Sequence, residues 1–139
     1  MPGTRSVDRL IVLDTQILLF DALEPKRLSR RARSALDEGM EADALACSDI
    51  SLWEIALLAA RRRIDAGPDI AAFIESTLQL RSVRVLPITP AIATLAQSDL
   101  FSHGDPADRI IGATAIQQRA PLISADERLR RVRDLEVIW

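Results

Sequence analysis

Short apolar runs alternate with longer helical segments along this chain of 139 residues, and no other feature of the sequence restricts its fold as strongly. A short run that is apolar throughout is typical of a strand buried on both faces, as in a parallel sheet. The expected strands are residues 10–13, 44–47, 83–86, 122–123 and 136–138. The expected helices are residues 17–23, 29–40, 49–62 after a cap at Ser48 or Asp49, 69–80, 90–97, 106–119 and 126–131. The alternation predicts an α/β fold whose parallel sheet is covered by helices on both faces.

The composition predicts one globular domain spanning residues 1–139. The hydrophobic fraction is 48% and the charged fraction 27%, which is ordinary for a soluble domain of this length. Aromatic residues make up only 4%, so the core is expected to consist of Leu, Ile, Val and Ala, with Trp53 and Trp139 as core anchors. The single cysteine, Cys47, is expected to be a small buried hydrophobic residue in a reducing compartment. Since no apolar run approaches the ~20 residues of a membrane span and no signal peptide is recognisable, we expect a cytoplasmic protein.

Five acidic residues occupy positions that this fold would bring together. They are Asp14, Glu54, Asp105, Asp108 and Asp126. In open parallel sheets, ligands bind at the carboxyl ends of the strands, near the point where the strand order reverses. Acids placed there are costly to desolvate unless a cation meets them. The chain has a single lysine and a single histidine, and so the set suggests a divalent metal ion.

Two of the acids follow expected strands. Asp14 comes after residues 10–13, and Asp126 follows the run Leu122–Ala125. Each has an equally good structural explanation as the cap of the helix that follows it. Thr15 can hydrogen-bond and orient the carboxylate of Asp14, as groups around metal ligands do.

The other three acids lie on expected helices. Glu54 falls on a helix face with Ile50, Trp53, Leu57 and Leu58, although this helix is apolar nearly all round. A buried glutamate either pairs with an arginine or helps to hold a cation. Asp105 is the expected N-cap of the helix over residues 106–119, with Pro106 in its first turn and Asp108 at the third position. We therefore favour Asp108 as the metal ligand, while a site with two ions could be reached by both aspartates.

Oxygen-only ligands select magnesium or manganese over zinc, and such ions suit phosphoryl chemistry. A phospho-aspartate hydrolase or a receiver domain also places acids at strand ends. The first would have a second aspartate where this chain has Gln16, and either would need a lysine late in the fold, whereas the only lysine is Lys26. Glycine-rich nucleotide-binding motifs are absent from the sequence, so a nucleotide cofactor has no support.

Basic residues are unevenly distributed, although the net charge is only −2. All but Lys26 are arginines, and most of the basic residues cluster at residues 26–33, 61–63 and 128–133. Arginine forks suit phosphate recognition, but charge runs of this kind also commonly coat a solvated face. His103 precedes Gly104 in an expected loop, and we place it outside the site.

Five motifs in this order resemble those of PIN-domain ribonucleases of the VapC toxin type. The motifs are Ile11–Thr15, Ser51–Ala56, Leu86–Thr89, His103–Arg109 and Leu122–Asp126. The resemblance runs from about Leu10 to Trp139. It departs from the family at Arg61–Asp65, where relatives often have a glycine-containing turn.

The resemblance implies a three-layer α/β/α domain that cleaves RNA with Mg²⁺ or Mn²⁺, is held in check by an antitoxin and often forms a homodimer. It assigns catalytic roles to Asp14, Glu54, Asp108 and Asp126, and metal binding to Asp14, Asp108, Asp126 and, as the alternative third acid, Asp105. Thr15 and Ser124 take supporting places beside the acids. The alternatives are a PIN-like domain that binds RNA or protein without catalysis, and a phosphoesterase that acts on small molecules.

Overall fold

The computed structural model describes residues 9–102 and 104–139, and they form a five-stranded sheet with every strand parallel. The strands are β1 (Ile11–Leu13), β2 (Leu45–Ser48), β3 (Arg84–Leu86), β4 (Leu122–Ile123) and β5 (Val137–Ile138). Their order across the sheet is β3-β2-β1-β4-β5. The chain therefore moves outward from β1 in one direction through β3, then returns to the other side of β1 with β4.

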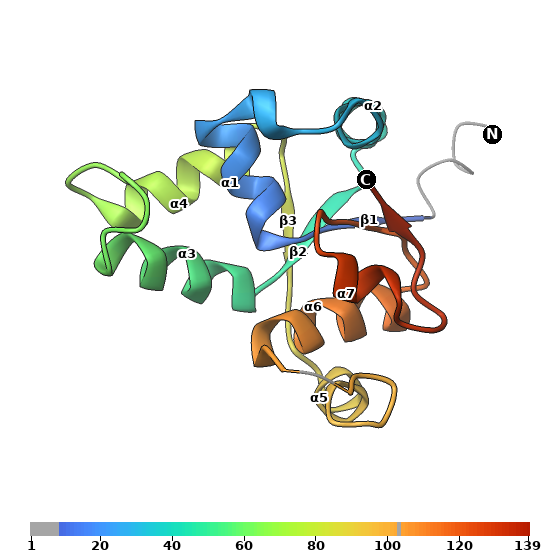
Figure 1. The fold of residues 1–139 in the computed structure, drawn as a ribbon. Helices are drawn as coiled ribbons and strands as arrows, with labels where there is room; N and C mark the ends of the chain where they lie inside the picture. Colours follow the sequence, from blue (N-terminus) through green and yellow to red (C-terminus); the bar gives the residue numbers. More distant parts are fainter. Residues whose placement is uncertain (1–8, 103) are drawn as a thin grey trace.

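Helices cover both faces of this sheet, as the alternation predicted (Figure 1). They are α1 (Thr15–Leu23), α2 (Arg30–Glu41), α3 (Ile50–Ala60), α4 (Ile70–Gln79), α5 (Pro90–Ala96), α6 (Pro106–Gln117) and α7 (Glu127–Arg130). Helices α1 and α2 lie on one side of the sheet, and α5, α6 and α7 lie on the other. Helix α3 contacts both α1 and α6, and so it joins the two sides. The three-layer α/β/α fold is confirmed.

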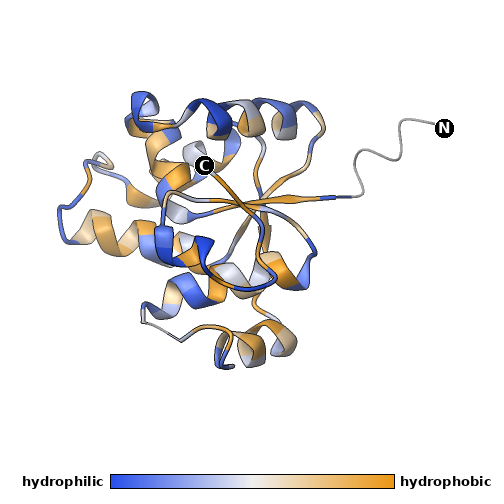
Figure 2. Cartoon of the chain, turned by 45° about the vertical axis from the view of Figure 1, so that its right-hand side comes forward, coloured by the Kyte–Doolittle hydropathy of each residue, from blue (hydrophilic) through white to orange (hydrophobic). Residues whose placement is uncertain are grey.

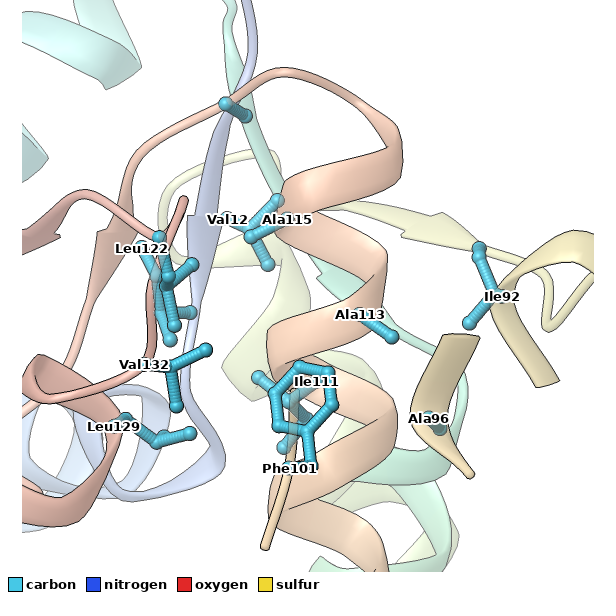
Figure 3. Packing of buried hydrophobic residues seen from close by; sticks show 12 residues of the cluster. Val12, Ile92, Ala96, Phe101, Ile111, Ala113, Ala115, Leu122, Leu129 and Val132 are labelled. Carbon is cyan, nitrogen blue, oxygen red and sulfur yellow. The ribbon is translucent and has the colours of Figure 1, made fainter. Parts of the chain in front are cut away.

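The core has two parts, one on each side of the sheet. Figure 3 shows the part in which Phe101, Ile111 and Leu129 pack beside β1 and β4. The second part contains Ile17, Leu36 and other aliphatic side chains of α1 and α2. Hydrophobic residues are concentrated in the central strands (Figure 2). Few aromatic side chains take part, in line with the composition.

Three single-residue expectations about the core have different outcomes. Cys47 is fully buried in β2, and its burial raises the pKa of the thiol to about 12. Trp139 packs against the second part of the core. The expectation for Trp53 was wrong, because its side chain is 57% exposed. Helix α3 is apolar nearly all round, so its periodicity did not determine which face would be buried.

Element boundaries agree with the predictions to within one or two residues, with two differences. Residues Pro25–Arg27 form an unexpected 3₁₀ turn, η2. The strand expected at residues 83–86 is more exposed than the central strands, and its Val85 is 38% exposed. Strand β3 lies at the edge of the sheet, where helices cover a strand less completely than at the centre.

The turn after α3 keeps a tight shape without the glycine that the resembled family often has there. Arg62 adopts a φ of 56°, in the left-handed region that favours glycine. In this turn, an arginine therefore adopts the backbone conformation that glycine favours. Within the described residues, no helix is long and apolar enough to cross a membrane.

Candidate metal-dependent active site

The reversal of strand order beside β1 produces a crevice at the carboxyl ends of β1 and β4. Such a switch point is the usual ligand site of an open parallel sheet, because the loops leaving the two strands diverge there. A cleft of about 380 Å³ lies at this end of the sheet. We call it the acidic cleft, and its lining includes Asp14, Glu54, Asp105, Asp108, Asp126, Thr15, Gln16, Leu58 and Arg128. All five acids that the sequence singled out are thus brought together.

Asp14 is held at the centre of the sheet. Its backbone N–H donates to Ile123 O at 3.0 Å, which extends the pairing of β1 with β4 by one residue. Its carboxylate makes no capping hydrogen bond to α1, so the cap explanation fails for this residue. Instead, the Ser124 hydroxyl donates to Asp14 Oδ2 at 2.6 Å. The side chain is thereby aimed into the cleft.

Burial dominates the electrostatics of Asp14, which is only 6% exposed. Burial raises its pKa to about 6, although the hydrogen bonds from Ser124 and from the Thr15 backbone act in the opposite direction. The negative charges of Asp126 and Asp105 add to the increase. A carboxylate that is both desolvated and surrounded by like charge gains strongly from a bound cation.

Glu54 reaches the same cleft from the second turn of α3. Thr15 donates a hydrogen bond from Oγ1 to Glu54 Oε1. Thr15 Oγ1 also lies 2.8 Å from Ser51 Oγ, and because its one proton goes to Glu54, Ser51 is the donor to it. Burial, followed by the charges of Asp14 and Asp105, raises the pKa of Glu54. The Thr15 hydroxyl therefore orients Glu54, whereas the sequence had suggested that it would orient Asp14.

Asp105 and Asp108 lie at the start of α6 and have different surroundings. Asp105 Oδ1 accepts from Ala107 N at 2.9 Å, so Asp105 caps the helix as expected. Asp108 lies further into the cleft, and burial together with the charges of Asp14, Asp105, Asp126 and Glu54 raises its pKa to about 8. The geometry favours Asp108 over Asp105 as the acid in need of a cation.

Asp126 differs from the other acids because a cation is already beside it. Burial alone would raise its pKa, but hydrogen bonds from the Arg128 backbone and side chain, together with the Arg128 charge, lower it. Asp126 Oδ1 caps α7 by accepting from Arg128 N at 2.8 Å. Arg128 Nε lies 3.5 Å from Asp126 Oδ1, and Arg128 Nη2 lies 3.7 Å from Asp108 Oδ2. The cap explanation therefore holds for Asp126, whose side chain also lines the acidic cleft.

Sequence reasoning missed two participants. Ser51 was not singled out, although it lies one helical turn before Glu54 and so on the same face of α3. Arg128 was assigned to a basic cluster, with no contact to the acids expected. No residue of the two other basic clusters lines the acidic cleft, although Arg27 and Arg63 line a neighbouring groove. His103 lies outside the described residues.

The donor set fits a hard divalent cation, because the acids offer only oxygen ligands. As the side chains stand in residues 9–102 and 104–139, no group of three acids, histidines or cysteines is arranged to hold a metal ion. The guanidinium of Arg128 lies next to two of the acids, Asp108 and Asp126.

The chain is similar to proteins of a known family. The model of the PIN domain matches residues 11–135. Ribonuclease VapC22 of Mycobacterium tuberculosis is 37% identical over 121 residues, which cover 86% of this chain and 89% of that protein.

Two solved structures share the fold at lower identity. VapBC2 from Rickettsia felis, bound to a DNA fragment from its promoter, matches with a TM-score of 0.68 and 14% identity over 92% of this chain and 96% of that one. A toxin–antitoxin complex from Klebsiella pneumoniae matches with a TM-score of 0.58 and 20% identity over 90% and 94% of the two chains. The chain therefore belongs to the PIN-domain family, and within it to the relatives of VapC, as the order of its acidic motifs predicted.

Proposed function

We propose that the protein is a divalent-metal-dependent endoribonuclease that acts as the toxin of a toxin–antitoxin pair. The observation that carries the proposal is the meeting of Asp14, Glu54, Asp108 and Asp126 in one cleft at the switch point of the sheet. Three of these acids have raised pKa values, and so the single positive charge of Arg128 does not compensate the negative charge of the cleft. The relationship to ribonuclease VapC22 supports RNA as the substrate.

Asp14, Asp108 and Asp126 are the residues that would hold Mg²⁺ or Mn²⁺, with Asp105 at the rim as the alternative ligand. The bound ion would lower the pKa of a coordinated water and neutralise charge on the phosphodiester. Binding would require Arg128 to leave Asp108 and Asp126, and its half-exposed side chain has room to do so.

Glu54 is the residue best suited to orient the attacking water and to take a proton from it. Its pKa is raised by burial, which makes the carboxylate a stronger base than an exposed glutamate. Its contact with Thr15, backed by Ser51, fixes the side chain at the wall of the cleft. Ser124 does the same for Asp14.

Cleavage of a labelled single-stranded RNA by the purified protein tests the enzymatic claim. We expect cleavage with Mg²⁺ or Mn²⁺, none in chelator, and none for Asp14→Asn. Glu75→Gln removes an exposed acid on α4 and serves as the control for charge. Cleavage that persists in chelator or in Asp14→Asn contradicts the mechanism. RNA binding without turnover would favour a non-catalytic domain, and hydrolysis of phosphomonoesters in place of RNA would favour a small-molecule phosphoesterase.

The toxin claim has its own test. The similar structure of a toxin–antitoxin complex supports an antitoxin as partner. We propose the cytoplasm as the place of action. We expect expression of the chain to arrest growth, co-expression of a small protein encoded immediately upstream to relieve it, and Asp14→Asn to be harmless. Arrest by Asp14→Asn as strong as by the unaltered chain would separate toxicity from the acidic cleft.

A homodimer is part of the proposal. Trp53 is 57% exposed on α3, and exposed tryptophan is enriched in protein interfaces. Light scattering measures the molar mass in solution and so tests for a dimer. Trp53→Ser is expected to shift the dimer toward the monomer. A monomeric unaltered protein would contradict it.

A further inference from the structure

A second cleft adjoins the acidic cleft and shares Arg128 with it. It has a volume of about 300 Å³ and is lined by Leu100, Ser102, Arg128, Arg131 and Val132. We call it the basic cleft. Its walls come from the segment that joins α5 to α6 and from α7 with the turn after it. The two clefts therefore meet at Arg128, on the same end of the molecule.

The charges of the two clefts are opposite. Five acids line the first, whereas the lining of the second contains two guanidinium groups and no carboxylate. An anionic chain could thus place one of its charges on a metal ion in the acidic cleft and its next charge beside the guanidinium groups of the basic cleft. Successive phosphates of a nucleic acid strand meet this requirement.

Both guanidinium groups are available for a ligand. Arg131 approaches Glu127 only to 3.9 Å, and both side chains are 76% exposed, so this pair contributes little. The contacts of Arg128 with Asp126 and Asp108, at 3.5 and 3.7 Å, are longer than a good charge-assisted hydrogen bond. The Arg128 side chain is 54% exposed and can turn away from the acids.

The remaining walls suit the other parts of a nucleotide. Val132 is buried and Leu100 is half-buried, so they offer an apolar surface for the face of a base or ribose. The exposed Ser102 hydroxyl can hydrogen-bond to a phosphate or sugar. A guanidinium fork beside an apolar wall binds phosphate and base together.

A second groove also touches the acidic cleft, through Gln16 and Leu58. It contains Arg27 and Arg63, but its lining is largely apolar and includes Glu24. Arg27 is engaged there, since its guanidinium lies 4.4 Å from the centre of the Phe20 ring and 3.3 Å from Glu24. This groove is the weaker candidate for a strand of phosphates.

We propose that the basic cleft binds the RNA nucleotide that flanks the scissile phosphate, with Arg131 and a displaced Arg128 on its phosphate. This inference rests on the proposed ribonuclease function and adds the path of the substrate. Arg128 would then have two positions: beside Asp108 and Asp126 without substrate, and on the flanking phosphate with it.

Arg131→Gln is the variant that tests the proposal, and Arg31→Gln, an exposed position on α2 across the sheet, is its control. Binding of a short single-stranded RNA is measured by fluorescence anisotropy as a function of salt, with every protein also carrying Asp14→Asn to prevent cleavage. Loss of one phosphate contact is expected to reduce the slope of log affinity against log salt by about 0.7. Arg31→Gln is expected to leave the slope unchanged.

Single phosphates replaced by neutral methylphosphonate identify the contact in proteins that retain Asp14. At one position flanking the scissile bond, the replacement is expected to lower kcat/KM about tenfold in the unaltered protein. In Arg131→Gln the same replacement is expected to have almost no further effect. Arg63→Gln, in the second groove, is expected to keep the full sensitivity.

The outcomes separate the two proposals. If the unaltered protein neither binds nor cleaves RNA, both fall. If it cleaves RNA but Arg131→Gln behaves like Arg31→Gln, or if Arg63→Gln in its place loses the sensitivity, the basic cleft is refuted while the ribonuclease remains. Unfolding in urea checks that the variants are folded, and the exposed position of Arg131 predicts no change in the midpoint.

Discussion

The Ser124 hydroxyl joins the ends of two neighbouring strands by donating to Asp14 Oδ2 at 2.6 Å, across 110 residues of sequence. Ser124 Oγ also accepts a hydrogen bond from Asp126 N at 3.0 Å. One buried serine therefore fixes the side chain of one acid and the backbone of another. The parallel pairing of Leu13 with Ile123 makes this possible, because it brings the next residues of both strands level with each other.

Ser124→Ala is expected to weaken metal binding and so to raise the concentration of Mn²⁺ that cleavage requires. Without the hydroxyl, Asp14 loses a hydrogen bond that lowers its pKa and fixes its orientation. Removing such a partner typically costs about 10- to 100-fold in metal affinity or activity. The measurement is the Mn²⁺ concentration at half-maximal RNA cleavage. Ser76→Ala, at an exposed site on α4, is the control, and equal Mn²⁺ requirements in the two variants would contradict the role of Ser124.

Substitution of the two aspartates that open α6 separates the cap from the candidate ligand. In Asp105→Asn the amide oxygen can still accept from Ala107 N, so most cleavage and the stability are expected to remain. In Asp108→Asn we expect cleavage to be lost and the metal-free protein to become more stable, because folding no longer has to protonate or desolvate this carboxylate. Cleavage rates and urea unfolding in chelator provide the measurements. The reverse ranking in cleavage would make Asp105 the third acid.

The metal-free protein is expected to lose stability as the pH rises from about 4 to about 8. The folded-state pKa values of Asp14, about 6, and Asp108, about 8, lie above the ordinary value of 3.8. In this window the folded state holds protons that the unfolded chain has released. The free energy of unfolding therefore falls by up to about 1.4 kcal/mol per pH unit for each such proton.

Urea unfolding in chelator at several pH values measures this trend. Asp108→Asn should flatten the curve between pH 6 and about 8, where Asp108 titrates. Adding Mg²⁺ should stabilise the protein more at the alkaline end, since the ion competes with protons for the same oxygens. A pH profile that is the same in Asp108→Asn and in Glu75→Gln would refute the assignment.

Arg81, in the segment before β3, forms ion pairs with both α1 and α2. Its guanidinium donates to Asp21 at 2.6 and 3.1 Å and to Asp37 at 2.9 Å, with 15% of the side chain exposed. Arg81→Gln leaves Asp21, whose side chain is only 13% exposed, without its partner and is expected to cost about 2–4 kcal/mol. The exposed pair of Arg84 with Asp43 provides the comparison, and Arg84→Gln should cost less than about 1 kcal/mol. Equal urea midpoints for the two variants would contradict this ranking.

Gly112 allows the closest approach of α6 to Phe101. A Cβ atom there would lie 2.7 Å from Phe101 Cε1, and the ring is fully buried. Gly112→Ala is therefore expected to destabilise the protein by about 1–3 kcal/mol, despite the better helix propensity of alanine. Gly104→Ala, with no atom within 4 Å of the added Cβ, should be nearly neutral. Chemical unfolding of both variants measures the change in the free energy of unfolding. A stabilised Gly112→Ala would show that Phe101 moves aside at little cost.

The elements that could be predicted were those with strong local signals. Ser29, Asp69 and Thr89 each accept a hydrogen bond from the first turn of the helix they precede, and all three helices begin where expected. Trp53 could not be placed, because helix α3 is apolar on nearly every side and so carries no pattern that distinguishes its buried face. The pairing of Arg128 with Asp108 was also beyond prediction, since it joins side chains from separate helices.

The sequence by itself determined the alternation of strands and helices, the five candidate acids and the order of motifs that identifies the family. These features depend on local periodicity, capping and spacing, which neighbouring residues largely determine. The tertiary structure decided which acids are desolvated, which one already has a cation, and that a basic cleft continues from the acidic one. Those properties depend on burial and on charges separated by many residues, and they arise only when β4 pairs beside β1 and brings the two ends of the chain together.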